Sequence, residues 1–318
     1  MKFTSIPENG LSWHGKLIYA FDTEGEARDV VVVIRDALQG CTIGAMRLYG
    51  VAEFEVDIAP YLRSYMAQWQ LPTESGLSPS RAACRVVVEI EGVVSPARTL
   101  FYGRINPVHG AVLSGVAETR VVRRSDVVRL TLYSPRKLSV RLTDAKLGGV
   151  VGQFDVMTSY MPYEFTFNLA EVPVGVGTLA IEVRGDGLEV AHMRYSIVRF
   201  GEAARQVAWR NRSGGVECYT FPICRTTECC SEVVGSAERR LKSAVIRSRL
   251  ISGQESSIEM GRIMEAICAT ELYECRGLEV VPMTLLTRRL IYGEGGAIKS
   301  IELDVEETWR GGGYEVAN

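Results

Sequence analysis

One stretch of this chain, WRNRSGGVECYTF at residues 209–221, separates two kinds of sequence pattern. It reads as two short strands joined by a polar turn, because Asn211 and the glycines after it favour tight turns and left-handed backbone. Alternate side chains of a strand point to opposite faces, so Glu217, Tyr219 and Phe221 are expected to share one face. Short strand patterns dominate before this stretch, and the longest helical pattern follows it.

The composition is that of a folded globular protein. The 318 residues are 47% hydrophobic and 23% charged, which is enough apolar sequence for two or three domains with buried cores. The 36 basic and 38 acidic residues nearly cancel. A net charge of −2 predicts no general attraction to nucleic acid or to an anionic membrane. We therefore interpret the short basic run at Arg120, Arg123 and Arg124 as a solvated strand face.

Two β-sandwich modules are predicted in the first part of the chain, over residues 1–104 and 105–200. Residues 163–169 alternate cleanly between apolar and polar side chains, as a half-buried strand does. Asp186-Gly187 is a strong signal for a two-residue hairpin turn. Several short strands at such spacing predict tandem immunoglobulin-like sandwiches in a mainly β chain.

A β-rich α+β domain is predicted over residues 201–310, with one main helix. Ser256 and Glu259 match a capping box, in which Ser256 caps the helix and Glu259 reaches back to it. Apolar residues then recur at helical spacing, which predicts a helix over about residues 257–274. The glycine-rich segment 311–318 is predicted to be a flexible tail.

Four of the eight cysteines lie close together, in the order Cys218-x5-Cys224-x4-Cys229-Cys230. Residues 224–236 show no clear period and are predicted to be a loop or an irregular edge. Structural zinc sites pair their ligands at C-x2-4-C spacing, and only the 224/229 pair approaches it. The alternatives are a metal site and buried or surface thiols, and we predict thiols with no metal.

No catalytic motif is evident in the sequence. The three histidines, His14, His109 and His192, are far apart and lie in different contexts. Neither a Gly-x-Ser-x-Gly elbow nor a Walker-type loop occurs. The acidic residues of the alternating strands fall on their solvent faces, where they keep sheet edges soluble. We therefore predict a non-enzymatic protein that needs no cofactor.

The N-terminal residues 1–16 contain no apolar core of signal-peptide length, and no run of about eighteen apolar residues occurs in the chain. The sequence therefore predicts synthesis in the cytoplasm without a signal peptide, and no membrane as a partner.

The order of these elements resembles that of tail-associated structural proteins of Bacteroides-type phages and prophages. The similarity rests on Trp209-x-Asn211-x2-Gly214-x2-Glu217-x-Tyr219-Thr-Phe221 and on two later segments, residues 289–292 and 302–306. The resemblance implies a structural role at the tail tip or baseplate, with other virion proteins or further copies of the chain as partners. It also implies a place in the virion.

The same stretch supplies candidate residues for an assembly interface. Tryptophan, tyrosine and phenylalanine are enriched at interface centres, and arginine suits their rims. The candidates are Trp209, Arg210, Asn211, Arg212, Glu217, Tyr219 and Phe221. The other interpretation is that Trp209 and Phe221 only fill the core of the third domain.

An alternative function is that of a surface or carbohydrate-binding protein, because immunoglobulin-like sandwiches often display ligand loops. Its candidate aromatic residues are Tyr61, Tyr65 and Trp69, near the end of the first module. This alternative predicts that the protein is exported and binds a glycan.

Overall fold

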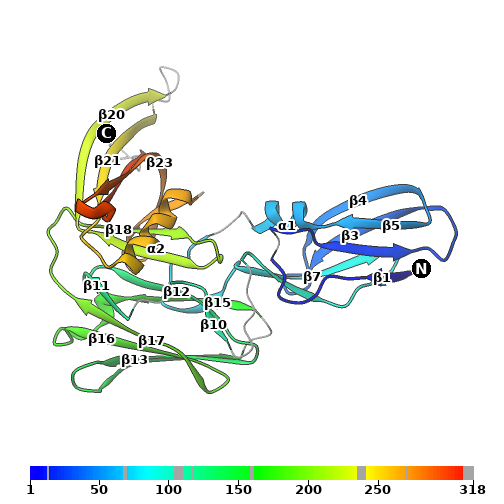
Figure 1. Ribbon diagram of the computed structural model, residues 1–318, viewed down its shortest axis with the longest axis horizontal. Coiled ribbons are helices and arrows are strands. Elements are labelled where there is room, and N and C mark those ends of the chain that lie inside the picture. The colour runs from blue at the N-terminus through cyan, green and yellow to red at the C-terminus, as the bar shows by residue number, and fades with distance from the viewer. Residues whose placement is uncertain are drawn as a thin grey trace, which may run out of the picture.

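The computed structural model describes residues 1–12, 14–66, 70–103, 110–115, 118–157, 161–234, 241–269 and 271–310. Within these ranges it describes all side chains except those of residues 229–234, 241–244, 294 and 308–310. Figure 1 shows three units: a sandwich at the right, a second sandwich at the lower left, and a C-terminal domain above the second. The mainly β fold class predicted from the sequence is confirmed, with two sandwiches followed by a β-rich domain that carries a helix.

The first sandwich packs a three-stranded sheet, β1-β2-β5, against a sheet of order β4-β3-β7-β8, in which β9 also pairs with β7. Val30, Val32 and Ile34 of β3 alternate into its core, where they meet β2 and β7. The elements of this unit are β1 (Lys2–Ser5), β2 (Ile18–Asp22), β3 (Arg28–Asp36), β4 (Thr42–Val51), β5 (Glu53–Asp57), α1 (Ala59–Met66), β7 (Ala83–Ile90), β8 (Val93–Val94) and β9 (Arg98–Phe101).

The second sandwich packs the sheet β10-β12-β15-β6 against the sheet β11-β17-β16-β13-β14. Its elements are β6 (Gly76–Pro79), β10 (Ala111–Val112), β11 (Thr119–Val122), β12 (Val127–Tyr133), β13 (Lys137–Asp144), β14 (Val150–Met157), β15 (Pro162–Asn168), η1 (Leu169–Glu171), β16 (Thr178–Gly185) and β17 (Leu188–Ile197). Strand β6 comes from the predicted first module but pairs with β15. A strand from before the boundary expected near residue 104 therefore completes a sheet of the second sandwich.

Every residue of β12 is buried on both faces, unlike the alternating strands around it. One face of β12 packs into the core of the second sandwich through Val128, Leu130 and Leu132. The other face carries Arg129 and Thr131 toward the remaining units. A strand covered on both sides in this way can join two parts of a protein, and β12 joins the second sandwich to the C-terminal domain.

The C-terminal domain is a seven-stranded antiparallel sheet of order β19-β18-β22-β23-β24-β21-β20 that encloses helix α2. Trp209, Phe221, Leu250 and Leu303 reach the core of this domain from four different strands. The elements are β18 (Arg205–Arg210), β19 (Val216–Phe221), β20 (Ile223–Val234), β21 (Leu241–Ile251), α2 (Ser257–Cys268), β22 (Leu272–Arg276), β23 (Glu279–Tyr292), η2 (Glu294–Gly296) and β24 (Ile298–Arg310).

Helix α2 begins as predicted and ends six residues earlier than predicted. The Ser256 hydroxyl accepts a hydrogen bond from the backbone N–H of Glu259 at 3.2 Å, so the predicted N-cap is confirmed. The carboxylate of Glu259 pairs with Arg262 at 2.8 Å. After Cys268 the backbone becomes extended and continues into β22. Leu272, which fitted the helical stripe, is 2% exposed and enters the same core from a strand.

Of the two alternatives predicted for residues 224–236, a loop or an irregular edge, the structure shows the edge over residues 224–234, with a break in register between Thr226 and Glu228. Residues 235 and 236 lie outside the described residues. Residues Ile223–Val234 form β20, the outer strand of the sheet, which pairs with β21 along its length. Residues 225–228 of this strand are all exposed, so no apolar face alternates with a polar one there. Its ion pair with β21, between Glu228 and Arg247 at 2.7 Å, supplies a contact that hydrophobic periodicity does not reveal.

Candidate functional site

The turn between β18 and β19 is shaped by Asn211. Its side-chain oxygen accepts hydrogen bonds from the N–H groups of Ser213 and Gly215, each at 2.9 Å. Gly214 has φ of +85°, which glycine adopts without strain. The turn predicted from Asn211 and the glycines is therefore present, and it places Glu217 in the first half of β19.

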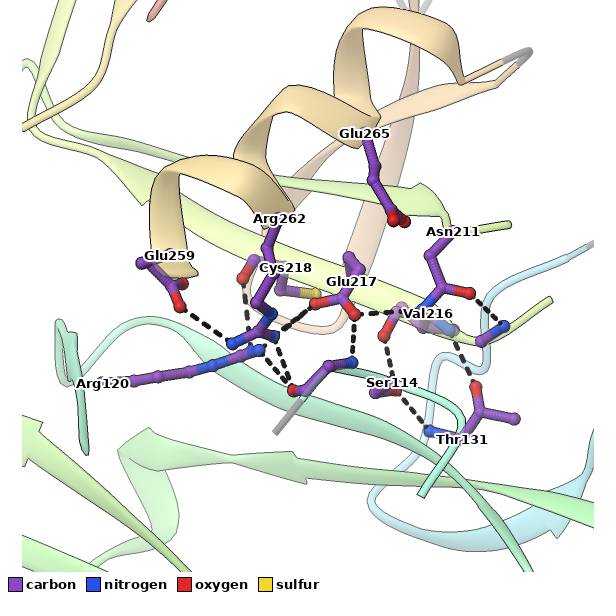
Figure 2. Close-up of polar contacts among 12 residues, drawn as sticks. Ser114, Arg120, Thr131, Asn211, Val216, Glu217, Cys218, Glu259, Arg262 and Glu265 are labelled. Carbon is purple, nitrogen blue, oxygen red and sulfur yellow. Dashed lines mark hydrogen bonds and ion pairs between the residues drawn. The ribbon is translucent and has the colours of Figure 1, made fainter. Parts of the chain in front are cut away.

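Glu217 is the centre of a buried ion-pair network between the second sandwich and the C-terminal domain (Figure 2). The side chain is 3% exposed. It accepts hydrogen bonds from Arg120 at 3.2 Å, from Arg262 at 2.6 Å, from Asn211 at 3.0 Å and from the backbone N–H of Gly115. These partners come from the second sandwich, from α2 and from the turn before β19, so one carboxylate holds three segments together.

The two arginines of this network also share a second acceptor. Arg120 and Arg262 donate to the backbone carbonyl of Gly115, at 2.7 and 2.6 Å. Arg262 pairs in addition with Glu259 at 2.8 Å. Two guanidinium groups therefore face two carboxylates, and their charges balance. We call Arg120, Glu217, Glu259 and Arg262 the junction cluster.

Burial dominates the electrostatics of the junction cluster. It raises the pKa of Glu217, although Arg120, the N–H of Gly115 and Asn211 oppose the rise. It also raises the pKa of Glu259, which Arg120 again opposes. Taking such charges out of water is costly unless opposite charges and hydrogen bonds meet them. The cluster is therefore favourable only when the two domains are docked.

Further hydrogen bonds continue the junction along β19, where it meets β12 and the segment before it. The Ser114 hydroxyl donates to the carbonyl of Val216 at 2.5 Å and accepts from the N–H of Thr131 at 2.8 Å. The Thr131 hydroxyl in turn accepts from the N–H of Val216 at 2.8 Å. Thr220 donates to Asp126 at 2.7 Å. The edge of β19 is thereby covered at Val216, whose N–H and C=O are both hydrogen-bonded inside the chain.

Arg210 connects the same hairpin to the first sandwich. Its guanidinium donates to the carbonyls of Met66 and Arg81, at 2.8 and 2.7 Å, and lies 4.1 Å from the centre of the Tyr102 ring. The side chain is 8% exposed. A cation over an aromatic face is worth more when both are removed from water. The β18–β19 hairpin thus contacts all three units.

Four glycines allow the backbones of the junction to approach this closely. A Cβ on Gly215 would lie 2.5 Å from the backbone of Leu113, and one on Gly103 would lie 2.5 Å from that of Ser213. A Cβ on Gly115 would overlap the Arg262 guanidinium, and one on Gly214 would overlap Tyr102. A side chain at Gly103, Gly214 or Gly215 would push the units apart, and one at Gly115 would displace the Arg262 guanidinium.

A cavity of about 390 Å³ lies beside the junction cluster, between the second sandwich and the C-terminal domain. Its walls include Tyr195, Tyr219, Phe200 and Glu255. Burial raises the pKa of Tyr195 to about 12, so its hydroxyl remains protonated at neutral pH. The hydroxyl of Tyr219 donates to Glu255 at 2.7 Å. The polar groups that line the cavity can donate and accept hydrogen bonds.

Arg129 is a second buried cation at this interface, 1% exposed. Its guanidinium donates to the carbonyls of Pro72 at 2.6 Å and Leu278 at 3.4 Å. The Cys275 thiol contacts the Arg129 guanidinium. The pKa of this thiol is lowered, mainly by its hydrogen bond with Cys218 and secondly by the positive charge of Arg129. Cys218 and Cys275 lie on strands that flank β18, too far apart for a disulfide without backbone movement.

Most of the residues predicted for an assembly interface lie inside the chain. Trp209 and Phe221 are 1% and 0% exposed and fill the core of the C-terminal domain, as the other interpretation expected. Arg210, Asn211 and Glu217 are buried in the junction between units. Tyr219 is partly buried, and Arg212 is exposed and pairs with Glu265 at 2.9 Å.

The other predicted residues do not form one site. Tyr61 packs against Gly44, and the Tyr65 hydroxyl donates to Asp36 at 3.0 Å, whereas Trp69 lies outside the described residues. His109 also lies outside the described residues, and His14 and His192 belong to different sandwiches. Six cysteines are described as free thiols: Cys41, Cys84, Cys218, Cys224, Cys268 and Cys275.

Three residues of the junction were missed or misread from the sequence. Arg120 was interpreted as part of a solvated face, but it is 8% exposed and paired with Glu217. Ser114 and Arg262 gave no signal, because their partners lie 102 and 45 residues away in the chain. No local spacing can reveal such contacts.

Across the described parts of the chain, no group of three or more His, Cys, Asp or Glu side chains is placed to hold a metal ion. Within the described residues, no helix is long and apolar enough to cross a membrane.

No family model matches this chain, and no curated protein matches it. Among solved structures it is similar to the native conformation of E. coli alpha-2-macroglobulin, determined by single-particle cryo-EM, with 9% sequence identity and a TM-score of 0.22. The alignment covers 97% of this chain, which spans only 20% of the length of that protein. A TM-score this low supports no inference about fold or function.

Proposed function

We propose that this protein is a non-enzymatic structural subunit of a protein assembly, and that the assembly is a phage or prophage tail, at the tip or baseplate. The resemblance in residues 209–221 and 289–306 suggests the tail. The proposed partners are other tail proteins or further copies of this chain, and the proposed location is the virion.

The observation that carries the proposal is the buried junction built around Glu217 and Arg210. Domains joined by small polar interfaces move relative to one another by default. Here one hairpin is held by both sandwiches through buried charges, at 3% exposure for Glu217 and 8% for Arg210. An extended body with fixed internal angles suits a subunit that must hold its neighbours at set positions.

The outer surface of the C-terminal sheet offers further support. Arg247 and Arg249 of β21 pair with Glu306 at 3.0 Å and with Asp304 at 2.7 Å on β24. Arg289 of β23 lies 3.3 Å from the same Asp304. Isolated exposed pairs contribute little, but a connected network limits fraying of long strands. Such a sheet suits a part that projects from the body, as β20 and β21 do in Figure 1.

The native mass of the purified protein, measured by light scattering over a concentration series with electron microscopy of large species, tests the proposal. We expect a defined oligomer or ring that grows with concentration. A strict monomer at every concentration, with no large species in the images, would count against a structural assembly role.

A second candidate is glycan binding, which one cavity favours. A space of about 320 Å³ between the two sandwiches is lined by Tyr65, Tyr163, Asp36, Gln39 and Arg81. Aromatic rings beside carboxylate, amide and guanidinium groups are typical of sugar sites. A glycan array tests this candidate: a hit that Tyr163→Ala abolishes would support it, and an empty array would remove it.

A further inference from the structure

Two outer strands of the sandwiches are weakly charged. Strand β4 is the last strand of its sheet in the first sandwich, and β14 is the last strand of its sheet in the second. Each carries a single charged residue, Arg47 in β4 and Asp155 in β14. Natural proteins usually protect outer strands with several charges, because unpaired backbone groups attract other strands. The outer strand β20, for comparison, carries Arg225 and Glu228 within its first half.

We propose that β4 of one copy of this chain pairs with β14 of the next copy, antiparallel, with Arg47 opposite Asp155. The partner is therefore a second copy of the chain, and the contact extends two sheets into one. This inference rests on the proposed function, because it names the surfaces through which the subunit assembles.

The faces of the two strands match in this register. When Arg47 lies opposite Asp155, Met46 lies opposite Val156 and Leu48 opposite Phe154. All four of these apolar side chains are partly buried against the core of their own sandwich. Pairing therefore joins the two apolar inner faces, and one residue of slip would turn one of them toward water.

The outer faces match as well. Tyr49, 70% exposed, falls opposite Gln153, and Met157, 72% exposed, falls opposite Ala45. Directly opposed side chains lie about 5 Å apart, close enough for the ion pair of Arg47 and Asp155 to form. Pairing would also cover two of the most exposed large apolar side chains among the described residues.

Charge also selects between possible partners. Pairing β4 with β4 brings two copies of Arg47 into one short strand pair, and pairing β14 with β14 does the same with Asp155. Like charges across a strand pair are unfavourable, whereas the mixed pair is complementary. The mixed contact uses two different surfaces, so it adds copies head to tail and builds a ring or a filament.

The positions of the two strands allow this arrangement. Figure 1 shows β4 on the outside of the first sandwich, at the upper right, and β13 at the lower left. Strand β14 pairs with β13 on the side away from β16. The two free edges therefore belong to distant parts of the molecule, and one copy can engage two neighbours at once.

Charge exchange tests the inference. In Arg47→Asp every copy carries two acids at the contact, and in Asp155→Arg every copy carries two arginines. We expect each variant alone to raise the dissociation constant of self-association about tenfold. Mixing the two variants restores both ion pairs, so the mixture should assemble as the wild type does, and so should the double variant. Arg194→Asp, an exposed charge change on β17, is the matched control and should assemble normally.

Sedimentation velocity over a concentration series separates the outcomes. The inference is supported if the wild type assembles, each single variant assembles more weakly, and the mixture of the two variants assembles as the wild type does. The inference is overturned if the wild type assembles but neither single variant weakens assembly, or if mixing the two variants does not restore it. Either result leaves the proposed function standing. A wild type that never assembles overturns both.

Discussion

Replacing Glu217 by glutamine tests whether the junction cluster holds the domains together. The substitution keeps the size of the side chain but removes the negative charge that Arg120 and Arg262 share, at 3.2 and 2.6 Å. Hydrogen bonds to charged groups contribute about 1.5–3 kcal/mol each, and breaking a buried ion pair costs about 3–5 kcal/mol. Because the pKa of Glu217 is raised by burial, losing the charge also relieves some desolvation cost. We therefore expect a loss near the lower end, about 3 kcal/mol.

Urea denaturation followed by tryptophan fluorescence and far-ultraviolet circular dichroism measures this loss. Trp209, one of four tryptophans in the chain, contributes a signal from the core of the C-terminal domain, which should lose its support first when the junction weakens. The matched control is Glu265→Gln on α2, the helix that also carries Arg262, since the partner of Glu265, Arg212, is 83% exposed. That control should change the free energy of unfolding by less than about 1 kcal/mol. Equal, small effects of both substitutions would refute the role assigned to Glu217.

Three further outcomes follow from the described contacts. Gly215→Ala places a methyl group 2.5 Å from the backbone of Leu113, so we expect a loss of about 3 kcal/mol in the same denaturation assay. Gly149→Ala, with nothing within 4 Å, should be nearly neutral, and similar values for both would contradict the close approach. Hydrogen bonds from Arg249 lower the pKa of Asp304 below its ordinary 3.8. The ionised Asp304 therefore stabilises the folded state above pH 3.8, and this contribution is lost as the pH falls through the folded-state pKa. The wild type should lose more stability than Asp304→Asn between pH 7 and pH 2, and parallel pH profiles of the two proteins would contradict this. Trp209→Ala should cost about 3–5 kcal/mol in thermal or urea unfolding, because it empties a core position, whereas Arg212→Ala should cost less than about 0.5 kcal/mol; a neutral Trp209→Ala would overturn its assignment to the core.

Local pattern predicted much of the architecture. The alternation of residues 163–169 and the Asp186-Gly187 turn correspond to β15 and to the β16–β17 hairpin. Asn211 and the glycines predicted the β18–β19 turn, and Ser256 predicted the first residue of α2. These features depend on neighbours within a few residues, which a sequence displays directly.

Pattern failed where a distant partner decides the conformation. Leu272 is equally apolar in a helix or a strand, and its pairing with Trp209 on β18 and Met283 on β23 makes it a strand residue. Residues 224–234 have no period of their own, and they are extended because β21 pairs with them. Propensity is weak beside such tertiary contacts.

The sequence by itself determined that this chain is mainly β, where most of its strands lie, and that residues 209–221 form a turn between two strands. Only the tertiary structure decided what that hairpin does. In the sequence, Glu217 is only an acid on a predicted strand. In the fold, Arg120, 97 residues before it, and Arg262, 45 residues after it, lie within hydrogen-bond distance of its carboxylate. The physical reason is that turns and strand alternation are set by short-range backbone geometry, whereas a buried charge is stabilised by whichever groups the fold brings to it.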